Sequence, residues 1–308
     1  MAKKEDKDLM ESGAKVKLGT SDKIIRGFGY VFLTLYSVCC IIPFIIIVST
    51  SFTSESVIRA EGVQFLPKDI TLTAYDMVTK SGGIWWSYLV TILLTVIGTG
   101  VGLSIIAMTG YALQRKDFPF RNGISFFIYF TSLFQAGLAP YYLLMTQTYH
   151  LKDNYLAVLL PLLMSPWLII LMKNFVKSIP HEITESGKID GAGDMRIFVS
   201  LILPMLKPAL ATIGLFLALG YWNEWYQSSL FLSSRVAVKP LQFTLYEIVN
   251  KTDALKNSVA GQFINLADIP QESVKMANAV LATGPIVMLY PFVQKYFISG
   301  ITVGAVKG

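Results

Sequence analysis

The chain has 308 residues, of which 53% are hydrophobic and 15% are charged, and its net charge at pH 7 is +6. A typical soluble domain is about 25% charged. Here the charges crowd between long charge-free runs, as a hydrocarbon environment requires. Cys39 and Cys40 are adjacent inside the first run, which excludes a disulfide framework or a cysteine metal site and leaves buried packing or lipidation. No basic stretch is interleaved with aromatic residues, so we expect no nucleic acid partner.

Residues 1–26 are polar and rich in lysine and predict a cytosolic tail. Six apolar runs follow, each long enough at 1.5 Å per residue to cross a hydrocarbon core of about 30 Å. The first run begins too far into the chain and is too long for an ordinary signal peptide, so we expect it to be retained. The predicted spans cover about 27–51, 84–112, 123–145, 154–173, 209–232 and 276–297. They predict an all-α integral membrane domain with six transmembrane helices over 27–298 and a cytosolic tail over 299–308.

The distribution of lysine and arginine predicts the orientation. With a cytosolic N-terminus, 17 of the 26 basic residues lie on the cytosolic side and nine on the other. The positive-inside rule therefore places both termini in the cytosol. The long outer connections, 52–83 and 232–275, either contact something outside the membrane or only cap the bundle, and 241–249 alternates as a short strand or helix would. In the second span, Gly98, Gly100 and Gly102 predict a small face for close helix contact.

The cytosolic connection 174–208 has the features of two short helices rather than of a linker. Pro180 suits a first helical turn, and the acidic residues at 182 and 185 favour a helix N-terminus. Gly191 and Gly193 then interrupt the helix, and Asp194 is a good cap for a second one. The pattern predicts a helix, a tight turn and a second helix at the cytosolic face.

This connection resembles the EAA loop of binding-protein-dependent ABC importer permeases. Glu185 and Gly191 stand at the family's glutamate and glycine positions, and Ser186 and Gly187 replace its two alanines with residues that are still small. In the family's I-x-L-P ending, Ile202 matches the isoleucine, but the leucine and Pro204 follow with no intervening residue, which is a small departure.

The resemblance implies a coupling helix that docks into a cleft of a cytosolic ATPase subunit and transmits its closure to the spans. Small residues would fit the cleft, Gly191 would permit close backbone approach, and Glu185 would supply a charge. The alternative is an amphipathic loop that only packs under the bundle. The expected ATPase-coupling residues are Glu185, Ser186, Gly187, Asp190, Gly191, Ala192 and Pro204.

The resemblance covers most of the chain from about residue 25. The segments 134–140, 222–225 and 300–308 look like those of carbohydrate-uptake permeases with the type I importer fold, of the LplC/YtcP-like group related to the second membrane subunit of the maltose importer. In that relative the C-terminal tail reaches between the ATPase subunits. The alternative is a functionless tail. The residues that would make this contact are Thr302, Gly304, Val306 and Lys307.

The resemblance also implies the partners and the location. We expect a second, homologous permease subunit, an ATP-binding-cassette ATPase dimer and an extracellular solute-binding protein, assembled in a bacterial plasma membrane among its lipids. ATP and Mg would be bound by the ATPase subunits and no cofactor or metal by this chain. The expected substrate is a carbohydrate, specifically an oligosaccharide, and a non-sugar solute is the alternative.

Glu224 is the only acidic residue inside a predicted span, and an intramembrane charge predicts a functional site. It lies near the outer end of the fifth span among aromatic residues, so an interfacial aromatic belt is the competing interpretation. Sugars stack on aromatic faces and bond to amide or carboxylate groups. The candidate substrate-pathway residues are Trp222, Asn223, Glu224, Trp225, Gln227, Gln135 and Tyr141.

The sequence disfavours two other classes of protein. An enzyme is disfavoured because His150 and His181 lie in connections, no His/Cys cluster lies inside the bundle, and no phosphate-binding G-x-x-x-x-G-K-[ST] loop is present. Energy must therefore come from a partner. A self-sufficient secondary transporter usually places charged or unwound elements at mid-membrane, and none is evident; co-purification of an ATPase would separate the two classes.

Overall fold

The computed structural model describes residues 20–80, 83–134, 136–256 and 271–305, and every regular element in these ranges is helical. The chain begins with α2 (Thr20–Ser51), followed by two short helices, α3 (Glu55–Glu61) and α4 (Thr73–Lys80). The next helix, α5 (Ile84–Gln114), has 31 residues and a length of about 46 Å. It carries no charged residue, as a helix that crosses a membrane requires.

The middle of the chain forms shorter pieces. They are α6 (Arg121–Leu133), α7 (Leu138–Leu143), the π-helical turn η1 (Leu144–Thr148), α8 (Leu156–Leu163) and α9 (Pro166–Lys177). The sequence predicted one span over 123–145, whereas α6 and α7–η1 meet at a bend of 113°. The break falls beside Gly137, which directly precedes α7 and has a positive φ of 92°. Glycine adopts this conformation without strain.

The predicted cytosolic connection folds into α10 (His181–Ile189), α11 (Asp194–Ile197), the π-helical turn η2 (Phe198–Ile202) and α12 (Leu203–Met205). The chain then bends by 84° into α13 (Lys207–Trp222). Two helices with one intervening turn agree with the sequence pattern, although the second helix is prolonged by η2 and α12.

The last helices are α14 (Tyr226–Phe231), α15 (Leu241–Lys256) and α16 (Glu272–Ala305). The predicted fifth span, 209–232, is broken between α13 and α14. The segment that alternates as a strand or a helix forms the helix α15. The predicted sixth span lies inside α16, which continues into the segment expected to be a tail.

Within the described residues, three stretches are long and apolar enough to cross a membrane: Ile24–Ser51, Ile84–Gln114 and Leu156–Lys177. Two bent pairs, one from α6 to η1 and one from α11 to α14, pass the same test together, which gives up to five spans. Large side chains of α2 are exposed along nearly its whole apolar length, for example 72% at Phe28 and 62% at Tyr36. A helix that is apolar all round belongs in lipid or against other membrane helices.

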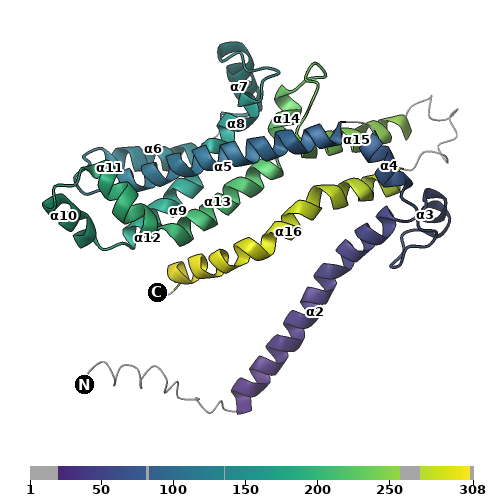
Figure 1. The fold of residues 1–308 in the computed structure, drawn as a ribbon, viewed down its shortest axis with the longest axis horizontal. Helices are drawn as coiled ribbons and strands as arrows, with labels where there is room; N and C mark the ends of the chain where they lie inside the picture. The colour runs from purple at the N-terminus through teal and green to yellow at the C-terminus, as the bar shows by residue number, and fades with distance from the viewer. Residues whose placement is uncertain (1–19, 81–82, 135, 257–270, 306–308) are drawn as a thin grey trace.

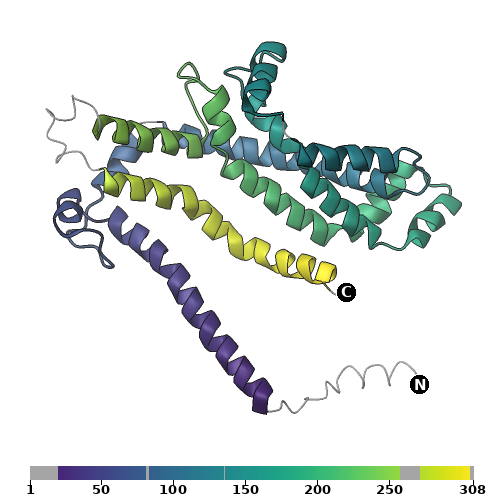
Figure 2. The same ribbon diagram turned by 180° about the vertical axis from the view of Figure 1, so that it is seen from behind.

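Helix α5 runs between two ends of the molecule, as Figures 1 and 2 show from opposite sides. The helices α10, α11 and α12 gather at one end, and α3, α4 and α15 at the other. Helices α9 and α13 pack along α5 between them. The structure therefore separates two small clusters of connecting helices by the full length of a span.

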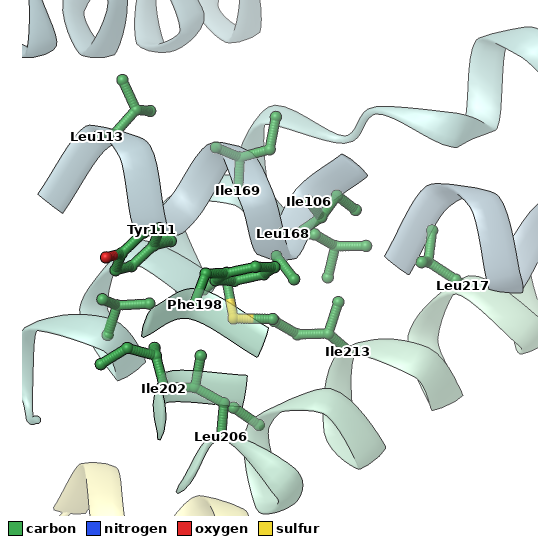
Figure 3. Packing of buried hydrophobic residues seen from close by; sticks show 14 of the residues in the cluster. Ile106, Tyr111, Leu113, Leu168, Ile169, Phe198, Ile202, Leu206, Ile213 and Leu217 are labelled. Atoms are coloured by element: carbon green, nitrogen blue, oxygen red, sulfur yellow. The ribbon is translucent and has the colours of Figure 1, made fainter. Parts of the chain in front are cut away.

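The largest core cluster lies at the α10 end, where α5, α9, η2 and α13 meet (Figure 3). The ring of Tyr111 packs on Phe198 with 5.1 Å between centroids. Met172 lies against Gly110 so closely that a Cβ there would be 2.6 Å from Met172 Cγ. This packing holds the end of α5 against the segment that follows α10.

The glycines of α5 divide by their position on the helix. Gly98 lies against the ring of Tyr221, and a Cβ on Gly102 would be 3.1 Å from the carbonyl oxygen of Leu163. Gly100 has nothing within 4 Å. The small face predicted for this span therefore consists of Gly98 and Gly102, four residues apart, and does not include Gly100.

Candidate functional sites

The turn between α10 and α11 is built around Gly191. Its φ is +75°, a left-handed conformation that glycine adopts without strain. The N–H of Ala192 donates to the carbonyl of Gly187 at 2.9 Å and that of Gly191 to the carbonyl of Lys188 at 3.0 Å, which is the Schellman pattern for ending a helix. Nothing lies within 4 Å of a Cβ on Gly191. The backbone conformation therefore requires glycine at this position. The sequence predicted a close approach of another backbone to Gly191, but no other group in the described part of this chain lies near a Cβ there.

One face of α10 is buried against the rest of the chain. Thr184 and Gly187 are buried, and a Cβ on Gly187 would be 3.0 Å from side-chain atoms of Ile197 and Leu201. Within this chain Gly187 therefore faces Ile197 and Leu201. Its small size lets α10 pack closely on α11 and η2.

The opposite face of α10 and its turn are exposed. Glu185, Ser186, Asp190 and Gly191 all lie on it. Ile189, which the sequence interpretation missed, is 86% exposed on the same surface. We call Glu185, Ser186, Ile189, Asp190 and Gly191 the exposed α10 surface. Ile189 is the one large apolar side chain among these five residues.

Three of the expected coupling residues do not belong to this surface. Gly187 faces inward, Ala192 is half-buried against the core, and Pro204 lies in α12 at the bend into α13. Asp194 does not cap α11 as predicted, because Gly193 takes the N-cap position and Asp194 follows it. The carboxylate of Asp194 instead pairs with Arg115.

A chain of four charged residues joins the α10 segment to the end of α5. Lys188 Nζ lies 2.7 Å from Asp117 Oδ2, Arg115 Nε donates to Asp117 Oδ1 at 2.8 Å, and Arg115 Nη1 lies 2.8 Å from Asp194 Oδ2. The hydrogen bonds from Arg115 and Lys188 hold the pKa of Asp117 well below its ordinary value. Hydrogen bonds to Asp117 and Asp194 raise the pKa of Arg115. We call Arg115, Asp117, Lys188 and Asp194 the ion network.

A cavity of about 490 Å³ lies between α10 and the residues that follow α5. Its lining includes Arg115, Asp117 and Lys188 of the ion network, together with Lys177 and His181. Among the described residues, no group of three or more His, Cys, Asp or Glu is placed to hold a metal ion.

Glu224 lies in the break between α13 and α14 and is only 7% exposed. Its carboxylate accepts a hydrogen bond from Ser228 Oγ at 2.7 Å and from the backbone N–H groups of Gln227 and Ser228. These are the unpaired donors at the start of α14. Glu224 therefore caps the first turn of α14, a role that neither the belt nor the substrate interpretation anticipated.

The other candidate pathway residues form two groups. Asn223 and Trp225 face α15: the ring of Trp225 stacks on Tyr246 with 4.6 Å between centroids, and Gln242 donates to Asn223 Oδ1 at 3.4 Å. Gln242 and Tyr246 were missed, although their spacing of four residues places them on one helix face. We call Asn223, Trp225, Gln242 and Tyr246 the α13–α15 cluster.

The second group joins α7 to α14. The hydroxyl of Tyr141 donates to Gln227 Oε1 at 2.8 Å. Trp222 belongs to neither group, because it is buried and its Nε1 donates to the carbonyl of Ala282 at 3.1 Å. Gln135 lies outside the described residues.

The expected C-terminal contact residues are only partly described. Thr302 and Gly304 lie within α16, so this part of the chain continues the helix. Val306 and Lys307 lie outside the described residues.

The fold and the exposed α10 surface define a class. Long apolar helices, bent spans and a group of short connecting helices at one end are typical of a multi-pass membrane protein. The family model of binding-protein-dependent transport system inner membrane components matches residues 100–303. The chain belongs to this family and is a permease component of a binding-protein-dependent ABC importer in the inner membrane; ATP is handled by partner ATPases.

Several relatives match over nearly their whole length. The polygalacturonan/rhamnogalacturonan transport system permease protein YtcP of Bacillus subtilis is 35% identical, over 91% of this chain and 96% of that one. Protein LplC of Bacillus subtilis is 35% identical, over 87% and 90%. The crystal structure of a bacterial ABC transporter involved in the import of the acidic polysaccharide alginate has a chain that is 32% identical, with a TM-score of 0.78 over 91% of this chain and 99% of that one.

Proposed function

We propose that this permease takes up a carbohydrate, specifically an oligosaccharide, and that ATPase motion reaches it through the exposed α10 surface. Support for the substrate class comes from the relatives, since YtcP is named for polygalacturonan and rhamnogalacturonan and the structural relative for alginate. The α13–α15 cluster adds chemistry of the right kind, because its half-exposed aromatic rings lie beside two amides.

The observation that carries the coupling proposal is the exposure of Ile189 next to a Schellman turn. A surface that docks on another protein needs a rigid shape and an apolar centre with a polar rim. The hydrogen-bonded Gly191 turn supplies the rigidity, Ile189 the centre, and Glu185 and Asp190 the rim.

The proposed assembly follows from the orientation predicted by the basic residues. The α10 end faces the cytosol, where two ATPase subunits bind ATP and Mg, and both termini lie on that side. The α15 end faces the cell exterior, where a solute-binding protein delivers the ligand. A second, homologous permease subunit completes the pathway through a bacterial plasma membrane.

The experiment purifies the complex from the native membrane through a tag on this chain. The wild-type chain should bring down an ATPase, and Gly191→Trp should reduce that recovery at least about tenfold, because a bulky residue at positive φ distorts the turn. Gly100→Trp is the control, since Gly100 also has open space around it but lies far from α10. Equal ATPase recovery from both variants would refute the docking surface.

The substrate class is tested on the same complex in proteoliposomes. Uptake and ATP hydrolysis are measured with its solute-binding protein against oligogalacturonides, alginate oligosaccharides, maltooligosaccharides and amino acids. Stimulation by one class of oligosaccharide is the expected result, and stimulation by amino acids alone would favour a non-sugar importer. A chain that transports without any ATPase would instead be a secondary carrier.

A further inference from the structure

We infer that the ion network is a brace that makes the α10 segment and the end of α5 move as one body during transport. The inference rests on the proposed function, because it concerns the path that the motion takes after docking. It assigns a positioning role to Arg115, Asp117, Lys188 and Asp194, of which the first three lie outside every set of residues expected from the sequence.

Helix α10 is held by apolar packing and by an ion pair. Its buried face, with Thr184 and Gly187, packs on Ile197 and Leu201 of the segment that follows it. That contact joins α10 to its own hairpin. A polar tie joins α10 to the connection that follows α5, because Lys188 Nζ lies 2.7 Å from Asp117 Oδ2.

Both halves of the hairpin are tied to the connection that follows α5, through Arg115 and Asp117. Lys188 belongs to α10 and Asp194 to α11, and the Arg115–Asp117 pair links them. Arg115 is the residue that ends α5. It contacts Asp117 through two nitrogens and Asp194 through a third, which fixes the plane of the guanidinium.

The connection that follows α5 is itself held in place by further contacts of Arg115. Arg121 Nη1 donates to the carbonyl of Arg115 at 3.2 Å, which ties it to the start of α6. The guanidinium lies 6.0 Å from the ring centroid of Tyr111, and Tyr111 packs on Phe198 of η2. Polar ties on the surface and apolar packing beneath them thus restrain the same junction.

Exposed ion pairs contribute little when they stand alone. Here they form one connected network around an arginine side chain that is only 21% exposed. The network acts through its geometry, because it transmits a displacement of α10 to the end of α5. Helix α5 in turn contacts α13 just before the break at Glu224, through Gly98 and Tyr221.

The test uses the intact complex in proteoliposomes and measures substrate uptake per ATP hydrolysed. Asp117→Asn should lower that ratio at least about fivefold while the ATPase still co-purifies, because Asp117 accepts from both Lys188 and Arg115. Lys116→Gln is the matched control: it removes a neighbouring charge from the same connection and leaves the network intact. A ratio for Asp117→Asn equal to that of Lys116→Gln would overturn the brace.

A bridged pair tests rigidity directly. Cysteines at 117 and 188, in a chain with Cys39 and Cys40 changed to alanine, are joined by a short bifunctional thiol reagent. The brace predicts that the unbridged double-cysteine complex has a lowered uptake per ATP, like Asp117→Asn, and that bridging restores this ratio to within about twofold of wild type, with the two single-cysteine chains as reagent controls. Loss of uptake on bridging would mean that α10 moves relative to α5 and would overturn the inference.

The two proposals fail separately. If Gly191→Trp keeps its ATPase, the docking surface fails. If Gly191→Trp loses the ATPase while Asp117→Asn retains normal uptake per ATP, docking stands and the brace alone is refuted.

Discussion

The ring of Tyr221 lies against the backbone of Gly98, in the space that the Cβ of any other residue would occupy. The Tyr221 hydroxyl donates to the carbonyl of Leu159 at 2.8 Å, so one side chain ties α13 to both α5 and α8. This contact lies three residues before Glu224, which occupies the break between α13 and α14. The close approach of α5 and α13 therefore depends on the absence of a side chain at position 98.

We predict that Gly98→Val destabilises the permease by about 1–3 kcal/mol, because the added side chain must displace a buried ring. Gly100→Val is the control, since nothing lies within 4 Å of its Cβ. Thermal unfolding of the purified chain in detergent measures both. Equal melting temperatures for the two variants would contradict the close contact.

A second prediction concerns the joint between α3 and α16. The buried carboxylate of Glu55 accepts hydrogen bonds from the backbone N–H groups of Glu272 and Ser273 and from Ser273 Oγ. The shortest distance to each of these three donors is 3.1 Å. Arg59 Nε also donates to this carboxylate, at 3.2 Å. Burial by itself would raise the pKa of Glu55, but these hydrogen bonds outweigh it and leave the pKa lowered.

Replacing Glu55 by Gln should cost about 1–3 kcal/mol of stability, because charge-assisted bonds at the start of α16 are lost. Glu61→Gln, which removes an exposed carboxylate of the same helix, should leave stability unchanged, because exposed ion pairs contribute little. Hydrogen exchange at the start of α16 reports the difference. Unchanged exchange in Glu55→Gln would show that the carboxylate does not hold this joint.

The pKa of Asp117 gives a prediction for pH. Because its folded pKa lies below the ordinary 3.8, the network's contribution is fully present above that ordinary value and is lost only as pH falls through the folded pKa. Uptake per ATP should therefore stay constant from about pH 5.5 to 8. A fall in this ratio in wild type, absent from Asp117→Asn, would contradict the assignment.

The α13–α15 cluster yields a prediction for substrate binding. Tyr246→Ala should raise the half-saturating concentration for uptake about tenfold, as loss of one stacked ring typically costs about 1–1.5 kcal/mol. Trp85→Ala is the control, because Trp85 is an exposed aromatic residue that packs on Tyr88 instead. If both variants have the same half-saturating concentration, the cluster lies outside the pathway.

The sequence predicted features that depend on local chemistry. The Gly191 turn was predicted because a positive φ favours glycine, and α5 was predicted because a charge-free run of its length suits a bilayer. The breaks at Gly137 and Glu224 were missed, because composition alone does not separate a bent span from a straight one. Both breaks have a feature in the sequence. Gly137 stands shortly before Pro140, and Glu224 stands four residues before Ser228.

Contacts between distant residues were beyond reach. Glu55 and Ser273 are 218 residues apart, and Lys188 and Asp117 are 71 apart. Nothing in their local patterns indicates that they meet, because each pair depends on how distant helices pack: α16 contacts α3 and α4, and α10 packs on α11 and η2. The inward direction of Gly187 was missed for the same reason, since it depends on where Ile197 and Leu201 lie.

The central claim is that an ATPase docks on the exposed α10 surface. Site-directed photo-crosslinking in the assembled complex tests it most directly, with a photoreactive residue at Ile189 and a control at Asn250, an exposed position on α15 at the opposite end of α5. The account predicts a crosslink from position 189 to the ATPase subunit and none from position 250. A crosslink from position 189 to the extracellular solute-binding protein, or none to the ATPase, would contradict it.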